Sequence, residues 1–361
     1  MSRVIFSLCV FVFCNNFFVF SQSHFNVKSL GARGDGKFDN WQILQRAVDK
    51  LASDGGGELY FPNGDYAIYN KTLIIWGNNI TIRGESKTGV KIIKKGQVGS
   101  FGDCIDVAGK IPGYVYFGNF GKGDYLKPLY YRGNLQPATN ILIRDLTITS
   151  QMAAQSKLHL ANNLGIVNSN RVTIKNCVLK NAPQSNLTIV NDQRMFVNDN
   201  INIDGCTFEG SRRHNVRVIT MNRGPLIGNK VTISNSIFKG VKGTDDRVKE
   251  LVGKQVNLWY RGGENKDSFG LVVANCVFDD SGIIYANGNV NGLQVTNSEL
   301  YDNIFIYHSS SRNKTPKLIF KNNRFYKSNN VNKHINSSLK NKFNKNKNIN
   351  IFPSSISKSL D

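Results

Sequence analysis

A short pattern of alternating apolar residues recurs seven times between residues 141 and 323. Each copy begins with an apolar residue, repeats one two positions later and usually reaches Asn or Gly before a small residue; the copies are Ile141–Leu146, Val172–Cys177, Ile201–Cys206, Val231–Ser236, Leu271–Cys276, Leu293–Ser298 and Leu318–Asn323. A period of two predicts β-strands, and the closing Asn predicts a tight turn. The copies start about 22 to 40 residues apart, and a unit of this size must stack on its neighbours to bury a core.

Stacked strand units of this length predict an all-β fold, a single right-handed parallel β-helix, which is a β-solenoid. Helical repeats would place apolar residues three and four positions apart, and these repeats do not. Equivalent positions should then stack from coil to coil and form an inward ladder of small side chains from Cys177, Cys206, Ser236, Cys276 and Ser298. No cysteine pair has metal-ligand spacing, so we expect packed free thiols and no metal site. A disulfide or a metal site is the alternative.

An amphipathic segment precedes the repeats. Residues 41–52 predict a helix with one apolar face, formed by Ile43, Leu44, Ala47, Val48 and Leu51. Asp39 or Asn40 can cap the start of this helix. Because a solenoid needs its open end covered, we expect the helix to close the N-terminal end of a β-helix domain at residues 22–327.

The two ends of the chain differ from its middle. Residues 1–21 resemble a secretory signal peptide, because Arg3 precedes an apolar stretch that ends at a small-residue cleavage site. Residues 328–361 are rich in Asn and Lys and predict a disordered basic tail, with a polyanion-binding arm as the alternative. No other segment is apolar enough to span a bilayer. We therefore predict a secreted protein, extracellular or periplasmic, without membrane insertion.

The net charge of +21 is concentrated toward the C-terminus, where about half of the excess lies. The rest of the chain keeps a modest basic excess, which suits an acidic partner. A nucleic acid is not the expected partner, since no nucleic-acid-binding motif accompanies the charge.

The start of the domain carries a set of short motifs, namely Gly31-Ala32, Gly34-Asp35-Gly36, Asp39, the three glycines at 55–57 and Pro62–Tyr66. This arrangement resembles the opening of the pectate lyase superfamily, whose β-helix members include pectate lyase 3, polygalacturonase-related, tailspike and mannuronan-epimerase-like proteins. Leu30 stands where the family usually has Phe. The resemblance covers about residues 24–325 and implies the fold more specifically than the activity, because the family holds lyases, hydrolases, epimerases and binding proteins.

A second strand follows several of the repeats, and its outward side chains are expected to form a glycan-binding face. Aligning these strands predicts three outward columns: Asn186/Asn215/Gln255/Asn303, Thr188/Arg217/Asn257/Phe305 and Val190/Ile219/Trp259/Tyr307. Amides bond to sugar hydroxyls and aromatic rings stack on sugar faces. The predicted substrate-binding residues are Arg217, Asn215, Asn257, Trp259, Arg261, Phe305 and Tyr307. The alternative is that a loop covers the aromatic residues.

The segment Ser211–Arg217 holds the strongest candidates for catalysis. Its Arg213-His214 pair resembles the Arg-His-Gly segment of mannuronan epimerases, in which Arg neutralises a uronate carboxylate and His moves the C5 proton. Neutralisation makes that proton more acidic, so that a base with a pKa near neutrality can remove it. Lys254 is a further candidate neutraliser or base, and Tyr260 a candidate base or acid. The alternative for His214 is packing within a loop.

Missing residues disfavour two related activities. The Asp-Pro-His-Glu motif of epimerases corresponds here to Thr188–Asn191, and a strand that carries two carboxylates in many relatives has Asn257 and Trp259 in their place. Two-carboxylate hydrolysis at that strand is therefore not expected. Since β-elimination needs only a neutraliser, a base and a proton donor, we predict a polysaccharide lyase that acts on a uronate-containing polysaccharide.

Three other functions stay open beside the lyase: a glycoside hydrolase of polygalacturonase-related type, a noncatalytic glycan-binding protein and, less favoured, a C5-epimerase. The cofactor is unknown; calcium could assist β-elimination, although no oxygen-rich loop identifies a site for it. An oligomer also stays open, because tailspike relatives are trimers.

Overall fold

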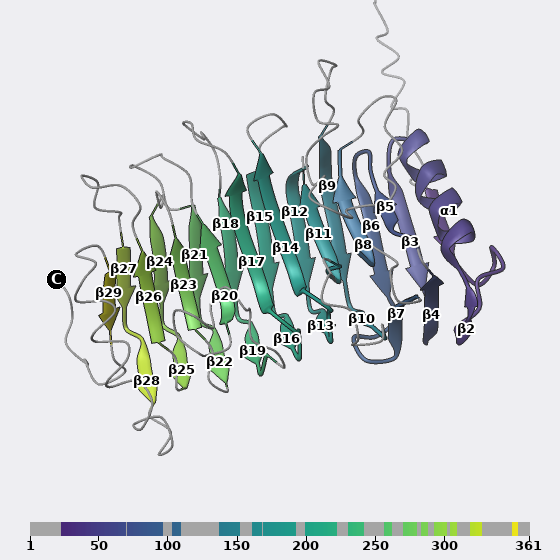
Figure 1. Ribbon diagram of the computed structural model, residues 1–361. Helices are drawn as coiled ribbons and strands as arrows, with labels where there is room; N and C mark the ends of the chain where they lie inside the picture. Colours follow the sequence, from purple (N-terminus) through teal and green to yellow (C-terminus); the bar gives the residue numbers. More distant parts are fainter. Residues whose placement is uncertain are drawn as a thin grey trace, which may run out of the picture.

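The computed structural model describes residues 23–69, 71–96, 103–109, 137–151, 161–167, 169–192, 199–221, 230–241, 256–261, 270–279, 283–287, 292–301, 304–308, 318–326 and 349–352. In these residues the chain winds through three long sheets that run side by side along one axis (Figure 1). Neighbouring strands in a sheet come from successive coils and are parallel, except at the last pair. This arrangement confirms the all-β right-handed parallel β-helix.

Each coil contributes strands to the sheets in a fixed order. Sheet A contains β1 (Ser23–Asn26), β3 (Gly57–Phe61), β6 (Ile80–Gly84), β9 (Ala138–Arg144), β12 (Ser169–Lys175), β15 (Asp199–Asp204), β18 (Val231–Ser234), β21 (Leu271–Ala274), β24 (Leu293–Thr296) and β27 (Leu318–Lys321). Sheet B contains β2 (Asp35–Asp39), β4 (Gly64–Tyr69), β7 (Val90–Lys95), β10 (Thr147–Ser150), β13 (Val178–Lys180), β16 (Thr207–Glu209), β19 (Ile237–Lys239), β22 (Val277–Asp279), β25 (Glu299–Tyr301) and β28 (Arg324–Tyr326). Sheet C contains β5 (Leu73–Ile75), β8 (Ile105–Ala108), β11 (Leu164–Val167), β14 (Ser185–Asp192), β17 (His214–Met221), β20 (Val256–Arg261), β23 (Ile283–Asn287), β26 (Ile304–His308) and β29 (Ile349–Phe352).

A residue with left-handed backbone geometry turns the chain from sheet A into sheet B. These residues have φ between 50° and 63°, and they are Asp145, Asn176, Gly205, Asn235, Asn275, Asn297 and Asn322. Gly adopts this conformation freely, and Asn and Asp do so more readily than other residues with a side chain. The repeats therefore end on Asn or Gly because the turn requires it, as the sequence predicts.

After five of these turns a small residue points into the core. Cys177, Cys206, Ser236, Cys276 and Ser298 are all at most 1% exposed. Where the residue is Ser, its hydroxyl bonds to main-chain groups on two coils. Ser236 Oγ accepts a bond from the N–H of Cys206 at 3.1 Å and donates to Ser234 O at 2.7 Å. The cysteines in the described part of the chain are free thiols, so the expectation of a packed ladder is confirmed.

A second ladder, made of amides, fills the corner between sheets B and C. Its members are fully buried, and they are Asn163, Asn186, Asn215 and Asn257. Each Nδ2 donates to the Oδ1 of the next, over 2.8, 2.8 and 2.6 Å. The first three also donate to the main-chain oxygens of Lys180, Glu209 and Lys239 at 2.7–2.9 Å. Because the first three amides bond both to the next amide and to the backbone, the ladder fixes the register between coils.

Helix α1 (Trp41–Ser53) covers the N-terminal end of the solenoid, at the right of Figure 1. Leu44, Ala47, Val48 and Leu51 are buried, and Ile43 packs beside them partly buried, which confirms the predicted apolar face. Asp39 Oδ1 accepts the N–H of Trp41 at 3.1 Å. The side chain of Asn40 does not cap the helix; it bonds to the main chain of Arg33 instead.

The predicted signal peptide at residues 1–21 lies outside the described residues, as does most of the predicted tail at 328–361. Within that tail, residues 349–352 form β29, which pairs antiparallel with β26 and adds a last strand to sheet C. The disorder expected for the rest of the tail stays a prediction. Among the described residues, the one helix is too short to cross a membrane.

We expect Asn215→Ala to destabilise the fold by about 2–4 kcal/mol, because it leaves buried partners on Asn186, Asn257 and Lys239 without their bonds. Urea unfolding followed by circular dichroism measures the change. The matched control is Asn202→Ala, an exposed residue on the outer face of sheet A, which should change stability by less than about 0.5 kcal/mol. Equal stability of the two variants would contradict the role of the ladder.

Candidate functional site

The outer face of sheet C has a different register from the one that the sequence alignment predicts. Val216 lies opposite Leu258 and Arg217 opposite Trp259, two positions away from the predicted pairing of Arg217 with Asn257. The buried amide ladder explains the shift, because Asn257 and not Gln255 continues it from Asn215. The predicted columns that join Arg217 to Asn257 and Ile219 to Trp259 are therefore wrong.

The amide side chains do not form a sugar-binding face. Asn186, Asn215 and Asn257 are fully buried; Asn186 and Asn215 bond to their neighbours and to the backbone, and Asn257 accepts the Nδ2 of Asn215 through its Oδ1. A glycan outside the solenoid cannot reach them in this conformation. The prediction that Asn215 and Asn257 bind substrate directly is corrected: both hold the coils in register.

The aromatic residues divide between core and surface. Tyr260 belongs to the core at 2% exposure, and burial raises the pKa of its hydroxyl. It is therefore not placed to act as an acid or base on a bound glycan. Phe305 pairs with Ile284 and Tyr307 with Ala286, so neither continues the column of Trp259, which runs on to Tyr285. The side chains of Phe305 and Tyr307 lie outside the described part.

Three of the predicted site residues do come together. The guanidinium of Arg217 lies over the ring of Trp259, with 4.7 Å between its carbon and the ring centroid, and the ring of His214 lies 4.9 Å from the same ring. His214 is fully buried, and its Nδ1 is 3.3 Å from Ser185 Oγ. The proposed contact of His214 with a substrate proton is therefore corrected; the imidazole packs against Trp259.

The other predicted residues contribute less. Arg213 is half-buried directly before β17, where its main-chain N–H donates to Gln184 O at 2.9 Å. Lys254 and the side chain of Arg261 lie outside the described residues. The predicted catalytic set of Arg213, His214, Lys254 and Tyr260 is thus not brought together by the described structure.

The structure instead reveals a carboxyl pair that sequence reasoning missed. Asp106 lies on the outer face of β8, and Asp103 precedes that strand by two residues; the two side chains are hydrogen-bonded to each other and half-buried. Asn162, on the next coil, donates to Asp103 Oδ1 through its main-chain N–H at 2.8 Å and its Nδ2 at 3.1 Å. Two carboxyls in contact share one proton, since both cannot ionise at such close range.

The surroundings decide which carboxyl holds that proton. Burial raises the pKa of Asp106 well above its usual value, and the charge of Asp103 raises it further. Burial also raises the pKa of Asp103, but the N–H donors of Asn162 and the hydrogen bond from Asp106 oppose this increase. The protonated member is therefore Asp106, and the ionised member is Asp103. Lys94, fully buried, adds a nearby positive charge and donates to Asp103 O at 3.1 Å.

A hydrogen-bond relay fixes the direction of the Asn162 amide. Its Oδ1 accepts the hydroxyl of Thr188 at 2.9 Å and the main-chain N–H of Ser185 at 3.2 Å. With its oxygen held by these donors, the Nδ2 must face Asp103. Thr188 thus supports the carboxyl pair from the following strand, β14, although it is itself only 4% exposed.

Gly165 makes room for the pair on the adjacent strand, β11, where it lies opposite Asp106. A Cβ at this position would overlap Asp106 Oδ1 and lie 2.6 Å from Asp103 Oδ2. The absence of a side chain therefore allows both carboxyls to lean across the sheet toward the next coil.

The pair escaped sequence reasoning because it lies before the regular repeats, in a coil that returns to sheet C only at residue 164. The available signal was two carboxylates three positions apart, on either side of an apolar Cys104-Ile105 pair. Within the described ranges, no group of three or more His, Cys, Asp or Glu side chains could hold a metal ion.

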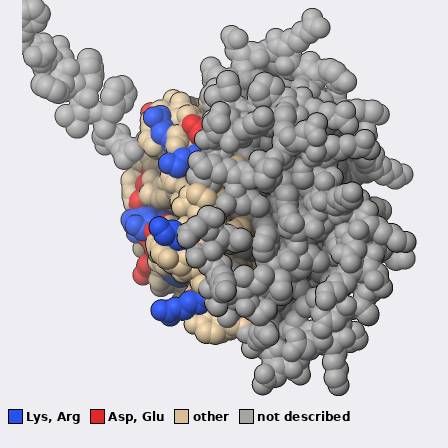
Figure 2. All heavy atoms as spheres, turned by 90° about the vertical axis from the view of Figure 1, so that its left-hand side faces the viewer, with Lys and Arg blue, Asp and Glu red and all other residues tan. Residues whose placement is uncertain are grey.

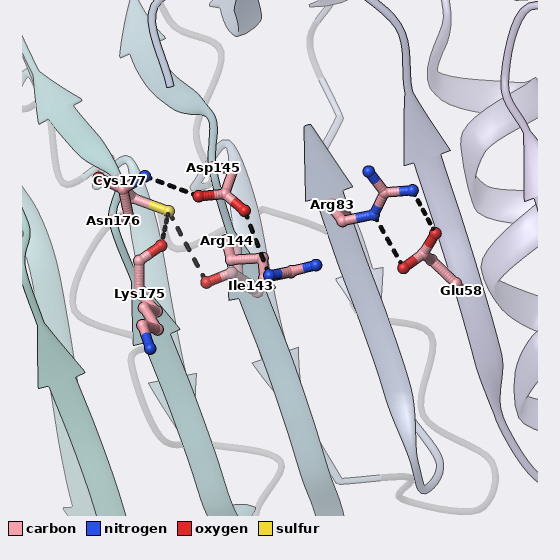
Figure 3. A network of polar contacts seen from close by, with 8 residues as sticks. All are labelled: Glu58, Arg83, Ile143, Arg144, Asp145, Lys175, Asn176 and Cys177. Carbon is pink, nitrogen blue, oxygen red and sulfur yellow. Dashed lines mark hydrogen bonds and ion pairs between the residues drawn. The ribbon is translucent and has the colours of Figure 1, made fainter. Parts of the chain in front are cut away.

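The other two outer faces are engaged in ion pairs of their own. On sheet A, Arg83 binds Glu58 through two bonds of 2.9 and 3.0 Å, and Arg144 lies 3.5 Å from Asp145 (Figure 3). On the described surface in Figure 2, basic and acidic side chains also lie side by side.

Comparison with known families gives one match over most of the chain. The model described as "Rhamnogalacturonase A/epimerase, pectate lyase-like" matches residues 24–247. This segment includes the N-terminal cap, the Asp103/Asp106 pair and the strand that carries Arg217.

Individual relatives match over shorter stretches. "Alginate lyase 7" of Azotobacter vinelandii is 46% identical over 44 residues, which are 12% of this chain and 5% of the relative. The SPbeta prophage-derived uncharacterized protein YomE of Bacillus subtilis is 32% identical over 83 residues, 21% of this chain and 13% of the relative. The chain thus spans only a small part of the length of these curated relatives.

Among solved structures, the A-module of the Azotobacter vinelandii mannuronan C-5 epimerase AlgE4 aligns with 83% of this chain and 95% of its own, at 14% identity and a TM-score of 0.41. An iota-carrageenase bound to iota-carrageenan fragments aligns with 78% of this chain and 55% of its own, at 14% identity and a TM-score of 0.46.

We expect Asp106→Asn to make the protein more stable than wild type at neutral pH. The folded-state pKa of Asp106 is raised, so its stabilising contribution is complete below the unfolded value of about 4 and is lost as pH rises through the raised pKa. Asn donates to Asp103 as the protonated acid does and carries no charge to lose. Thermal melts across pH measure the change. Toward neutral pH the free energy of unfolding of the variant should exceed that of wild type by about 1 kcal/mol or more, and in acid the two should be equal.

The matched control is Asp279→Asn, an exposed residue on the outer face of sheet B, which should have the melting temperature of wild type at every pH. Wild type and Asp106→Asn with the same pH dependence would contradict a protonated Asp106.

Proposed function

The chain belongs to the rhamnogalacturonase A/epimerase family of pectate lyase-like proteins, and from this premise we propose that it hydrolyses an acidic polysaccharide along the outer face of sheet C. The observation that carries the proposal is the close approach of the Asp103 and Asp106 carboxyls beside Gly165; the pKa of Asp106 is raised well above its usual value by burial, and that of Asp103 is raised less because the Asn162 donors oppose burial. Titratable groups whose surroundings separate their protonation states in this way suit general acid–base catalysis.

In the proposed reaction Asp106 gives its proton to the glycosidic oxygen as the bond from that oxygen to the anomeric carbon breaks. A water molecule forms the new bond to the anomeric carbon and releases a proton to the Asp103 carboxylate. The products are a new reducing end and a hydroxyl on the departing sugar. Transfer of the proton from Asp103 to Asp106 restores the pair.

The hydrogen bond between the carboxyls brings them closer than the about 5 Å of retaining or about 6.5–9.5 Å of inverting glycosidases. The bound sugar must therefore separate them. The half-buried position of both side chains at the surface of sheet C allows this movement. Asn162 holds the carboxyl of Asp103, and Lys94 bonds to the main-chain oxygen of the same residue.

The β-elimination expected from the sequence has less support. The candidate bases were His214, Lys254 and Tyr260, with Tyr260 also the candidate acid; His214 and Tyr260 are enclosed by protein, and Lys254 lies outside the described residues. The family holds members of different activity, so the product formed must decide between the two reactions. Secretion, which the N-terminal residues predict, belongs to the same proposal, because a polysaccharide of this kind lies outside the cell.

We expect Asp106→Asn and Asp103→Asn each to reduce the release of reducing ends from uronate or sulfated polysaccharides by about 10²–10⁴-fold. Reducing-end assays measure hydrolysis, and the absorbance of unsaturated uronate, recorded in parallel, measures β-elimination. Asp279→Asn again serves as the control and should keep full activity. A rise in unsaturated uronate would show a lyase instead, and binding without either product would show a noncatalytic glycan-binding protein.

We expect Gly165→Ala to abolish most of the same activity, because its Cβ would occupy the space of the Asp106 carboxyl. Reducing-end release should fall at least tenfold, by analogy with other displaced acid catalysts. Circular dichroism checks that the fold is kept. Wild-type activity in this variant would contradict the placement of the reaction over Gly165.

A further inference from the structure

The outward positions on sheet C follow one another in a fixed order. Strand pairing places Asp106 beside Gly165, Gly165 beside Thr188, Thr188 beside Arg217 and Arg217 beside Trp259. A linear glycan that lies along the solenoid axis with its scissile bond over Asp106 would therefore reach Arg217 three strands further on.

Arg217 is held in a defined orientation. Its guanidinium lies over the ring of Trp259 at 4.7 Å, and the buried His214 packs against the same ring at 4.9 Å. Arg217 and Trp259 are both half-exposed. A guanidinium stacked on an aromatic face directs its N–H donors sideways, in its own plane, where they match the two oxygens of a carboxylate or sulfate.

The distance between the carboxyl pair and Arg217 follows from the strand spacing. Three steps between neighbouring strands amount to about 14 Å along the axis. One pyranose unit is comparable in length to one such step. The anionic group that meets Arg217 therefore belongs to a sugar about three units from the bond cleaved at Asp106.

We propose that Arg217, held on Trp259, is a subsite for the carboxylate or sulfate of a remote sugar, and that it makes the protein select acidic glycans by length. The location of the scissile bond rests on the proposed function. The contact between Arg217 and an anionic sugar does not, so it can be tested in a protein that does not cleave.

The test measures binding to the Asp106→Asn variant by calorimetry, so that no substrate is consumed. The probes are galacturonate, mannuronate and sulfated carrageenan oligosaccharides, from dimers to octamers. We expect affinity for at least one series to rise sharply once the oligomer spans both Asp106 and Arg217. Adding Arg217→Gln should remove that rise and cost the long oligomers about tenfold or more in affinity, with little effect on dimers.

Two controls isolate the interaction. Arg217→Lys keeps the charge but loses the planar stack, and it should recover only part of the affinity. Lys175→Gln removes an exposed charge from the outer face of sheet A (Figure 3) and should leave binding unchanged. Carboxyl-reduced uronate oligomers should lose the length effect, whereas a sulfated series that keeps it would identify sulfate as the recognised group.

The two proposals fail in different ways. The remote anionic subsite is wrong if Arg217→Gln lowers the affinity for oligomers of every length equally, or for none. It is also wrong if the substitution lowers the affinity for carboxyl-reduced oligomers by as much as for the uronates. Neither result depends on whether Asp106 is the catalytic acid. If the length threshold depends on Arg217 but wild type releases no reducing ends from the bound series, the subsite stands and hydrolysis is wrong.

Discussion

The constraint on which the rest of the structure depends is the register between coils. A left-handed residue such as Asn176 turns sheet A into sheet B, and the amide ladder through Asn186 and Asn215 locks sheet B to sheet C. With both corners held, every side chain on an outer face lies one strand spacing from its counterpart. The solenoid thus converts positions in the sequence into regular steps along an axis, a geometry suited to a linear polymer.

The carboxyl pair depends on this register in a direct way. Asp103 and Asp106 come from one coil, Asn162 and Gly165 from the next, and Thr188 from the one after that. Two coils supply the donors that keep Asp103 ionised and the space into which both carboxyls lean. A slip of one residue would turn outward side chains inward and separate the acid from the groups that set its protonation.

The buried polar groups show how closely structure and chemistry are linked here. Asn215 and Asn257 occupy strand positions that alternation alone assigns to the outer face, yet they bond inside the corner. His214 and Tyr260, the residues most suggestive of acid–base chemistry in the sequence, pack within the protein. Some polar residues in the solenoid therefore hold the coils together, and others lie on the outer face where a substrate can bind. Their hydrogen-bonding capacity does not show to which of these groups a residue belongs.

The sequence by itself determined the fold, the turn residues, the inward thiol ladder and the capping helix, because each depends on local alternation, left-handed backbone preference or helical spacing. It also identified Arg217 and Trp259 as outward residues. Only the tertiary structure decided which strands face each other, since the loops between coils differ in length and hide the register. That register placed Asp106 beside Gly165, removed His214 and Tyr260 from the surface, and stacked Arg217 on Trp259, contacts between residues that are distant along the chain.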